Sequence, residues 1–123
     1  MCSVLMSIKP EFVQRILSGK KKYEFRKKVC RRQVEKIYIY STVPVQMVVG
    51  EAEVEFVLVE PPENLWEKTK EDAGIDKAFF DRYYENKEEA VAYKLVNVLK
   101  YNKPRTLGEL GVKTAPQSFL YIG

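Results

Sequence analysis

Residues 19–32 of this chain read GKKKYEFRKKVCRR, a stretch with eight Lys or Arg side chains and a single acid, Glu24. The whole chain has 21 Lys and Arg against 17 Asp and Glu, a net charge of +4. The stretch alone carries +7, and the remaining residues, with 13 cations and 16 acids, carry −3. The protein is therefore a mildly acidic chain with one strongly basic segment, which indicates an anionic partner for that segment.

Within this stretch, Tyr23 and Phe25 alternate with Glu24 and Arg26. A period of two predicts a β-strand over residues 22–27, with both aromatic rings on one face and the charged pair on the other. A basic strand whose aromatic side chains are buried suits contact with phosphate groups. A charged strand that is only solvated is the alternative interpretation.

The rest of the chain alternates between strand and helix patterns. Pro10 and Gly19 bound one predicted helix, Pro61 begins a second helical region, and Asp76 is the expected N-cap of a third helix. The order predicts an α+β fold in a single domain, residues 1–123, with a mixed sheet of about five to six strands curled into a barrel and three helices outside it. Strands other than that of the basic stretch are expected at residues 3–8, 36–40, 45–60 with a bulge at Gly50, 90–101 and 117–122.

The composition argues against several classes of function. The chain contains no His, which removes Ser-His and Cys-His nucleophile pairs and His-containing zinc sites. Cys2 and Cys30 form no metal-binding motif, so we expect no metal site and reduced thiols in the cytoplasm. No GxGxxG or P-loop is present and no apolar run approaches the length of a membrane span, so we expect no cofactor and no membrane partner.

The acidic side chains are concentrated in the middle of the chain. Residues 51–89 contain 13 acids and five bases. A face of this sign repels polyanions, so we expect it to lie away from any nucleic acid. It is also a possible surface for a protein partner.

Four residues of the basic stretch, Gly19, Lys21, Glu24 and Arg26, follow the pattern G-x-K-x-x-E-x-R after a predicted strand and helix. This pattern resembles the signature of the ASCH domain, a branch of the PUA-like superfamily. The likeness covers most of the chain and includes SIKPEF at residues 7–12, the strand at residues 37–40, V-x-G-E-x-E at residues 48–53 and APQSF at residues 115–119.

The resemblance implies a PUA-like β-barrel with a cleft lined by Lys21, Glu24 and Arg26. In that family the cleft is proposed to bind RNA, and transcription coactivators carry such a domain. Similar small bacterial N4-acetylcytidine amidohydrolases have a Thr nucleophile where this chain has Glu24, a departure that argues against that activity. Other relatives are reported as ribonucleases that rely on Lys, Tyr and Ser, residue types present here as Lys21, Tyr40 and Ser41.

The basic segment supports two hypotheses of different classes. The first is an RNA- or nucleotide-binding module, in RNA metabolism or in the regulation of transcription or translation, which binds through a basic cleft. The second is a metal-independent hydrolase of RNA or of a modified nucleoside, in which Lys21 activates the nucleophile or stabilises charge, Glu24 is the base and Ser41 or Thr42 is the nucleophile. The expected nucleic-acid-binding residues are Lys20, Lys21, Glu24, Arg26, Lys28, Tyr40, Ser41, Gln117 and Ser118.

Ordinary structural roles compete with these assignments. Lys21 is equally suited to an ion pair with Glu24, and Glu24 to the role of counter-ion for the surrounding cations. Tyr40 lies in a strongly apolar strand and is a good candidate for the core.

Overall fold

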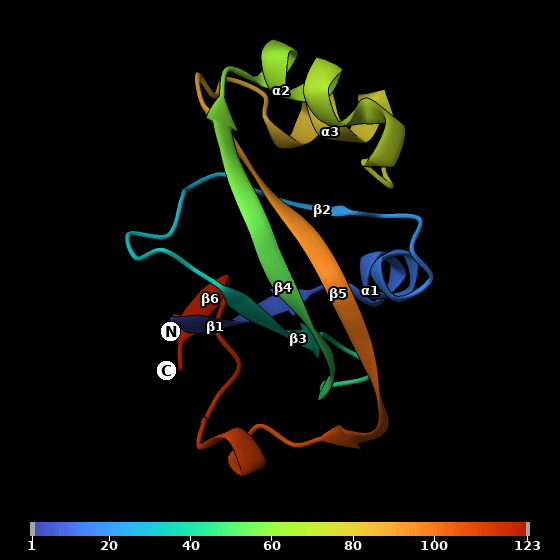
Figure 1. Ribbon diagram of the computed structural model, residues 1–123, viewed down its shortest axis with the longest axis vertical. Coiled ribbons are helices and arrows are strands. Elements are labelled where there is room, and N and C mark those ends of the chain that lie inside the picture. The colour runs from blue at the N-terminus through green and yellow to red at the C-terminus, as the bar shows by residue number, and fades with distance from the viewer. Residues whose placement is uncertain (1, 123) are drawn as a thin grey trace.

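The computed structural model describes residues 2–122 of the chain (Figure 1). Its elements confirm the predicted α+β fold, with six strands and three α-helices. In chain order they are β1 (Ser3–Ile8), α1 (Pro10–Leu17), β2 (Tyr23–Arg26), β3 (Lys36–Ser41), β4 (Met47–Glu60), α2 (Pro62–Thr69), the short helix η1 (Lys70–Asp72), α3 (Lys77–Tyr83), β5 (Ala90–Arg105), the short helix η2 (Gly108–Leu110) and β6 (Phe119–Tyr121).

The strands form one mixed sheet in the order β2-β5-β4-β3-β1-β6. Among the described strands, only β1 and β3 pair in parallel, with α1 and β2 between them in the chain. The register between β4 and β5 shifts between Val48 and Gly50, which confirms the predicted bulge. A Cβ atom at Gly50 would lie 2.5 Å from the carbonyl oxygen of Leu99, so only glycine fits here. Bulges bend and twist a strand, and the long pair β4–β5 curves so that the sheet forms a half-barrel (Figure 1).

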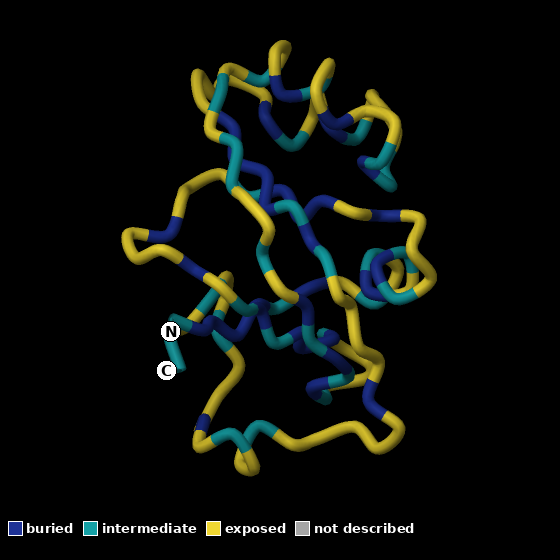
Figure 2. The backbone as a smooth tube through the Cα atoms, viewed as in Figure 1, coloured by how far each residue is buried: buried dark blue, intermediate teal, exposed yellow. Residues whose placement is uncertain are grey.

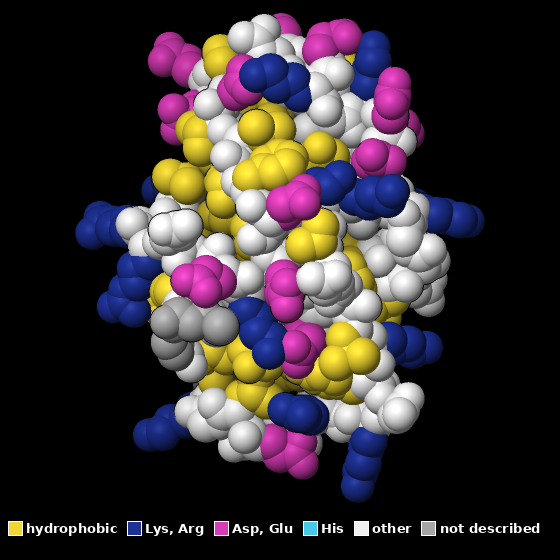
Figure 3. Space-filling model, viewed as in Figure 1, with side chains coloured by type: hydrophobic (Ala, Val, Ile, Leu, Met, Phe, Trp, Pro, Cys, Tyr) yellow, Lys and Arg dark blue, Asp and Glu magenta, His cyan; other side chains and the backbone are white. Residues whose placement is uncertain are grey.

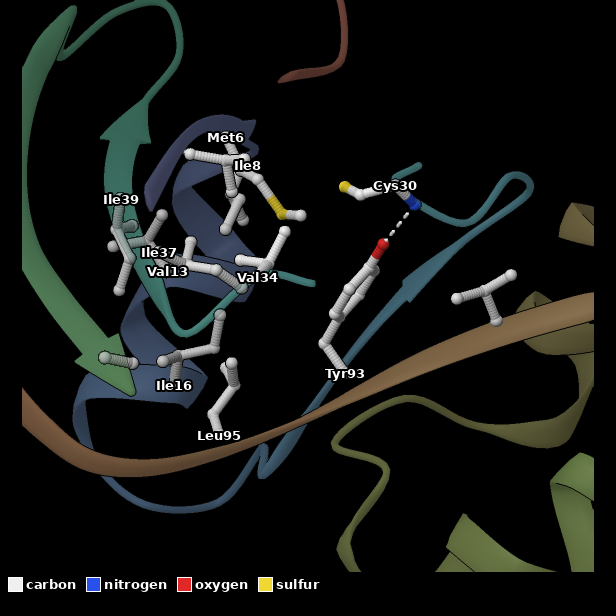
Figure 4. Packing of buried hydrophobic residues seen from close by; sticks show 13 residues of the cluster. Met6, Ile8, Val13, Ile16, Cys30, Val34, Ile37, Ile39, Tyr93 and Leu95 are labelled. Carbon is white, nitrogen blue, oxygen red and sulfur yellow. Dashed lines mark hydrogen bonds between the residues drawn. The ribbon is translucent and has the colours of Figure 1, made fainter. Parts of the chain in front are cut away.

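The largest buried cluster lies between the curved sheet and α1. Val13 and Ile16 of α1 pack there against Ile37 and Ile39 of β3 (Figure 4). Figure 2 shows that buried positions follow β1, β3 and the first half of β5, while exposed residues concentrate in the connections. The helix boundaries also match the sequence pattern, because Pro10 is the first residue of α1 and Gly19 has a φ of +86°.

A second buried cluster joins α2 and α3 to the end of the sheet. Leu65 of α2 and Phe80 of α3 pack there against Tyr23 and Phe25 of β2. The Asp76 side chain accepts a hydrogen bond from the N–H of Phe79 at 2.8 Å, which confirms it as the N-cap of α3. The two aromatic residues of β2 therefore face α2 and α3, and Glu24 is left to face elsewhere, as the alternation predicts.

Five strands differ in length from the prediction: β3 is one residue longer, β4 begins two residues later, and β2, β5 and β6 differ as follows. β2 is shorter because it pairs only with β5, over four residues. β5 continues to Arg105 because it stays paired with β4 as far as Val48. β6 pairs with β1 over three residues only.

Within residues 2–122, no helix has the length and apolar character needed to cross a membrane.

Candidate nucleic-acid interface

A cleft of about 280 Å³ opens between β2, α1 and α3, beside the end of β1. Its charged side chains belong to Lys9, Lys21, Glu24 and Arg26. Its remaining lining is mainly apolar and aromatic, with Gln117 from the segment before β6. The cleft is therefore a mixed site with an aromatic wall, and not the uniformly basic groove that the composition suggests.

Lys21 lies at the floor of the cleft and is only 3% exposed. Its ammonium Nζ donates a hydrogen bond to the carbonyl oxygen of Ala73 at 3.1 Å and lies 4.6 Å from the centroid of the Phe25 ring. Burial lowers the pKa of Lys21 from 10.5 to about 8, and the charge of Glu24 opposes this shift. The backbone at Gly74 approaches so closely that a Cβ atom there would lie 2.3 Å from the Cβ of Lys21.

Glu24 is the second buried charge of the cleft, at 6% exposure. Its Oε2 accepts hydrogen bonds from Nε and Nη2 of Arg26, at 3.1 and 2.8 Å. Its Oε1 receives no hydrogen bond from residues 2–122, and no buried side-chain oxygen or nitrogen in that range lacks a partner. Oε1 is therefore open to solvent through the cleft. Glu24 and Lys21 form no ion pair within 4.0 Å, so the alternative of a direct salt bridge between them is wrong.

Arg26 ties three segments together at the edge of the cleft. Besides Glu24, its guanidinium donates to the carbonyl oxygen of Ser7 at 3.0 Å and to the Ser118 hydroxyl at 3.1 Å. The Ser7 hydroxyl donates to the carbonyl oxygen of Pro116 at 2.7 Å, a second link to the same segment. A longer bond from the guanidinium to the carbonyl oxygen of Ser118, at 3.4 Å, occupies its last donor, so Arg26 positions Glu24 and Ser118 and is not a free fork for phosphate.

The aromatic wall comes from α1 and α3. Phe12 and Phe79 meet edge to face at 5.2 Å between ring centroids, and Phe79 and Tyr83 lie nearly parallel at 6.3 Å. Helical spacing places Phe79 and Tyr83 on one side of α3, where the sequence suggests core packing. The sequence pattern does not identify this wall, because a cleft wall and a core face have the same apolar periodicity. The only signal for it was the likeness of SIKPEF, which contains Lys9 and Phe12, to the family.

The sequence predicts that the acidic segment, residues 51–89, lies away from any nucleic-acid site. In the structure, part of the segment lies at the cleft. Ile75 and α3 belong to it and form one side of the cleft. Many of its acidic side chains lie over the end of the molecule formed by α2 and α3, and others lie along β4 (Figure 3). The segment contributes apolar residues to the cleft and presents its charges elsewhere.

The structure brings together some of the predicted site residues. Lys21, Glu24, Arg26 and Gln117 line the cleft, and Ser118 contacts Arg26. The others lie outside it: Lys20 and Lys28 are exposed, Tyr40 is buried with Leu5 and Val48, and Ser41 is 2% exposed and lines a separate hollow against α1.

The placement of Tyr40 and Ser41 corrects their assignment to the site. Tyr40 packs in the core of a different cluster, where its ring cannot meet a base in the cleft. Ser41 ends β3 on the side of α1 away from Lys21, so it is not the nucleophile of a reaction at Lys21 and Glu24. Within residues 2–122, no three His, Cys, Asp or Glu side chains come together as a metal-binding group.

The family model of the ASCH domain matches residues 6–105. The chain belongs to the ASCH domain family. The crystal structure of ASCH from Zymomonas mobilis is similar over 98% of this chain and 87% of that one, with 29% identity and a TM-score of 0.89. This confirms both the predicted family and the PUA-like fold.

The chain is also similar to parts of two longer curated proteins. An ASCH domain-containing ribonuclease of Zymomonas mobilis is 34% identical over 92 residues, 74% of this chain and 62% of that protein. The large ribosomal subunit protein uL22 of Ureaplasma parvum is 29% identical over 121 residues, 98% of this chain and 39% of that protein. This ASCH chain therefore spans less than two thirds of the length of either relative.

Proposed function

We propose that this ASCH domain binds RNA by taking one unpaired base into the cleft. A base has a flat apolar face and an edge of hydrogen-bond donors and acceptors, and single-stranded RNA presents both. The cleft has Phe79 and Tyr83 for the face, and Lys21 and Glu24 for the edge. The observation that carries the proposal is this pair of buried opposite charges, not bonded to each other, beside an aromatic wall.

The polar groups of the cleft suit the edge of a base better than a phosphate. An ionised carboxylate only accepts hydrogen bonds, so Glu24 Oε1 selects an N–H group and repels an anion. The Lys21 ammonium donates to a base carbonyl or ring nitrogen, and the Gln117 amide both donates and accepts. Small-molecule sites usually begin at roughly 300 Å³, and the cleft of about 280 Å³ matches one base or nucleoside.

The experiment is the binding of a labelled ten-nucleotide RNA, followed by fluorescence anisotropy at low salt. Phe79→Leu keeps an apolar side chain but removes the flat ring, and stacking on an aromatic side chain contributes roughly 1–3 kcal/mol per base. We therefore expect a loss of roughly 5- to 150-fold in affinity. The matched control is Phe56→Leu, at a half-exposed ring outside the lining of the cleft. Equal effects of the two variants, or no binding by the wild type, would contradict the proposal.

A second candidate, metal-independent cleavage of RNA, is favoured by the pKa of Lys21. A group with a pKa near 8 transfers protons efficiently close to neutral pH. In this candidate Glu24 accepts the proton of the ribose 2′-hydroxyl, the 2′-oxygen attacks phosphorus, and Lys21 protonates the departing 5′-oxygen. The name of the Zymomonas relative, a ribonuclease, is consistent with it. Incubation of RNA with wild type and Glu24→Gln in the presence of EDTA tests it, and intact RNA after long incubation with the wild type rules it out.

Roles in transcription or translation, a cytoplasmic setting and a protein partner on residues 51–89 stay predictions.

A further inference from the structure

The basic stretch divides into two surfaces in the structure. Lys20 and Lys22 are exposed before β2, and Lys22 lies 3.9 Å from Asp72 and lines a different hollow from the cleft. The remaining exposed cations lie between β2 and β3, on the segment that loops out at the left of Figure 1. We call this group the basic connection, and it consists of Lys27, Lys28, Arg31 and Arg32.

The basic connection is held firmly against the core. Cys30 and Val34 of the same segment are buried in the largest cluster. The Cys30 N–H donates to the Tyr93 hydroxyl at 2.8 Å (Figure 4), and the Arg32 N–H donates to the Tyr121 hydroxyl at 3.3 Å. The four cations are therefore presented from an anchored backbone, which reduces the entropy lost when a ligand binds.

These four cations lack acidic partners. Among residues 2–122, none of them has a carboxylate within 4.0 Å, whereas Lys68 on α2, Lys70 on η1 and Lys77 on α3 each pair with a nearby acid. In Figure 3, Lys and Arg side chains project into solvent on the side of the molecule where the connection runs. Free charges of one sign on a fixed surface attract a polyanion.

The basic connection begins at the edge of the cleft. The ammonium of Lys27 lies 4.7 Å from the centroid of the Tyr83 ring, and Tyr83 lines the cleft. A strand with a base in the cleft would therefore have its next phosphates beside Lys27. Within the cleft, Glu24 repels a phosphate and Arg26 already bonds to Glu24, Ser7 and Ser118, so Lys9 is the exposed cation of the lining.

We propose that the basic connection binds the phosphodiester backbone of the single strand whose base occupies the cleft. This inference rests on the proposed function and adds the direction in which the strand leaves. An acidic protein surface is the competing occupant. The basic connection begins beside the cleft, and this favours the nucleic acid. One strand can then place a base in the cleft and its phosphates on the basic connection.

The test compares Lys28→Ala/Arg31→Ala with Lys103→Ala/Lys113→Ala, which removes the same charge from two exposed residues, one in β5 and one after η2. Each phosphate contact contributes about 0.7 to the salt slope of single-strand binding, so the first variant should lower the slope by about 1.4. The fall in affinity between 50 and 200 mM salt then shrinks by about sevenfold. The control should keep the wild-type slope. All four substituted residues are exposed, so both variants should fold.

The arms of the experiment separate the two proposals. If the wild type binds and Phe79→Leu weakens binding, but Lys28→Ala/Arg31→Ala keeps the wild-type slope, the backbone path is overturned and the proposed function stands. If the wild type binds no oligonucleotide, both are overturned. A DNA strand of the same sequence should show the same change in slope, because phosphate contacts are common to RNA and DNA. If both double variants keep the wild-type salt slope on RNA and on DNA, the backbone path is wrong and an acidic protein is the occupant of the basic connection.

Discussion

Replacing Lys21 with Met should remove RNA binding and, at pH 7, make the fold more stable. Lys21 is charged at pH 7 but buried, and its pKa falls from 10.5 in the unfolded chain to about 8 in the folded one. A shift of this size corresponds to about 3 kcal/mol of unfavourable free energy, at 1.36 kcal/mol per pKa unit. Loss of the hydrogen bond to the Ala73 carbonyl offsets about 1 kcal/mol of the gain, so the variant should be more stable by about 2 kcal/mol.

The gain in stability of Lys21→Met over wild type should depend on pH. Between pH 8 and 10.5 the unfolded chain holds the Lys21 proton more firmly than the folded chain does, so wild-type stability from this group rises with pH. The advantage of Lys21→Met should therefore be full below pH 8 and disappear by about pH 10.5. Other titrating groups are the same in both proteins and cancel in the difference.

The assay is urea denaturation of wild type and Lys21→Met at pH 7 and at pH 10.5. Lys22→Met, at a half-exposed neighbour, is the matched control and should change stability by less than about 0.5 kcal/mol at either pH. A Lys21→Met variant that is less stable than wild type at pH 7 would refute the reasoning. Lys21 would then be a structural ammonium and not a charge that the fold holds at a cost for a ligand.

Three further predictions concern the same site and its support. RNA affinity should fall about fivefold between pH 8 and pH 9 at constant ionic strength as Lys21 loses its proton, and Lys21→Met should show no such step in any residual binding. Arg26→Lys keeps the charge but cannot reach Glu24, Ser7 and Ser118 together, so denaturation should show a loss of about 2 kcal/mol, with the exposed Arg82→Lys as the unaffected control. Gly50→Ala should cost about 1–3 kcal/mol by the same assay, since its Cβ would collide with a β5 carbonyl; a wild-type midpoint would show that the bulge can relax.

The sequence was sufficient to predict the parts of the fold and site that depend on local periodicity. Alternation in β2 separates Tyr23 and Phe25, which face α2 and α3, from Glu24, which faces the cleft. Proline and glycine marked the ends of α1, and Asp76 marked the start of α3. These features depend on neighbours within a few residues along the chain, so one sequence is enough to infer them.

The remaining features depend on contacts between distant segments. Ser118 lies 92 residues from Arg26 in the chain, and its hydroxyl accepts a hydrogen bond from the Arg26 guanidinium. The backbone at Ala73 and Gly74 encloses Lys21. No local pattern indicates which side chains a cation meets at such separations. Tyr40 illustrates the same limit, because an aromatic residue in an apolar strand has the same pattern whether it lines a cleft or fills a core.

The most direct measurement is a crystal structure of this domain bound to a short single-stranded RNA. We predict one base stacked against Phe79 and Tyr83, with its edge hydrogen-bonded to Nζ of Lys21 and Oε1 of Glu24. An RNA bound only at another surface, with the cleft between α1 and α3 unoccupied, would contradict the account.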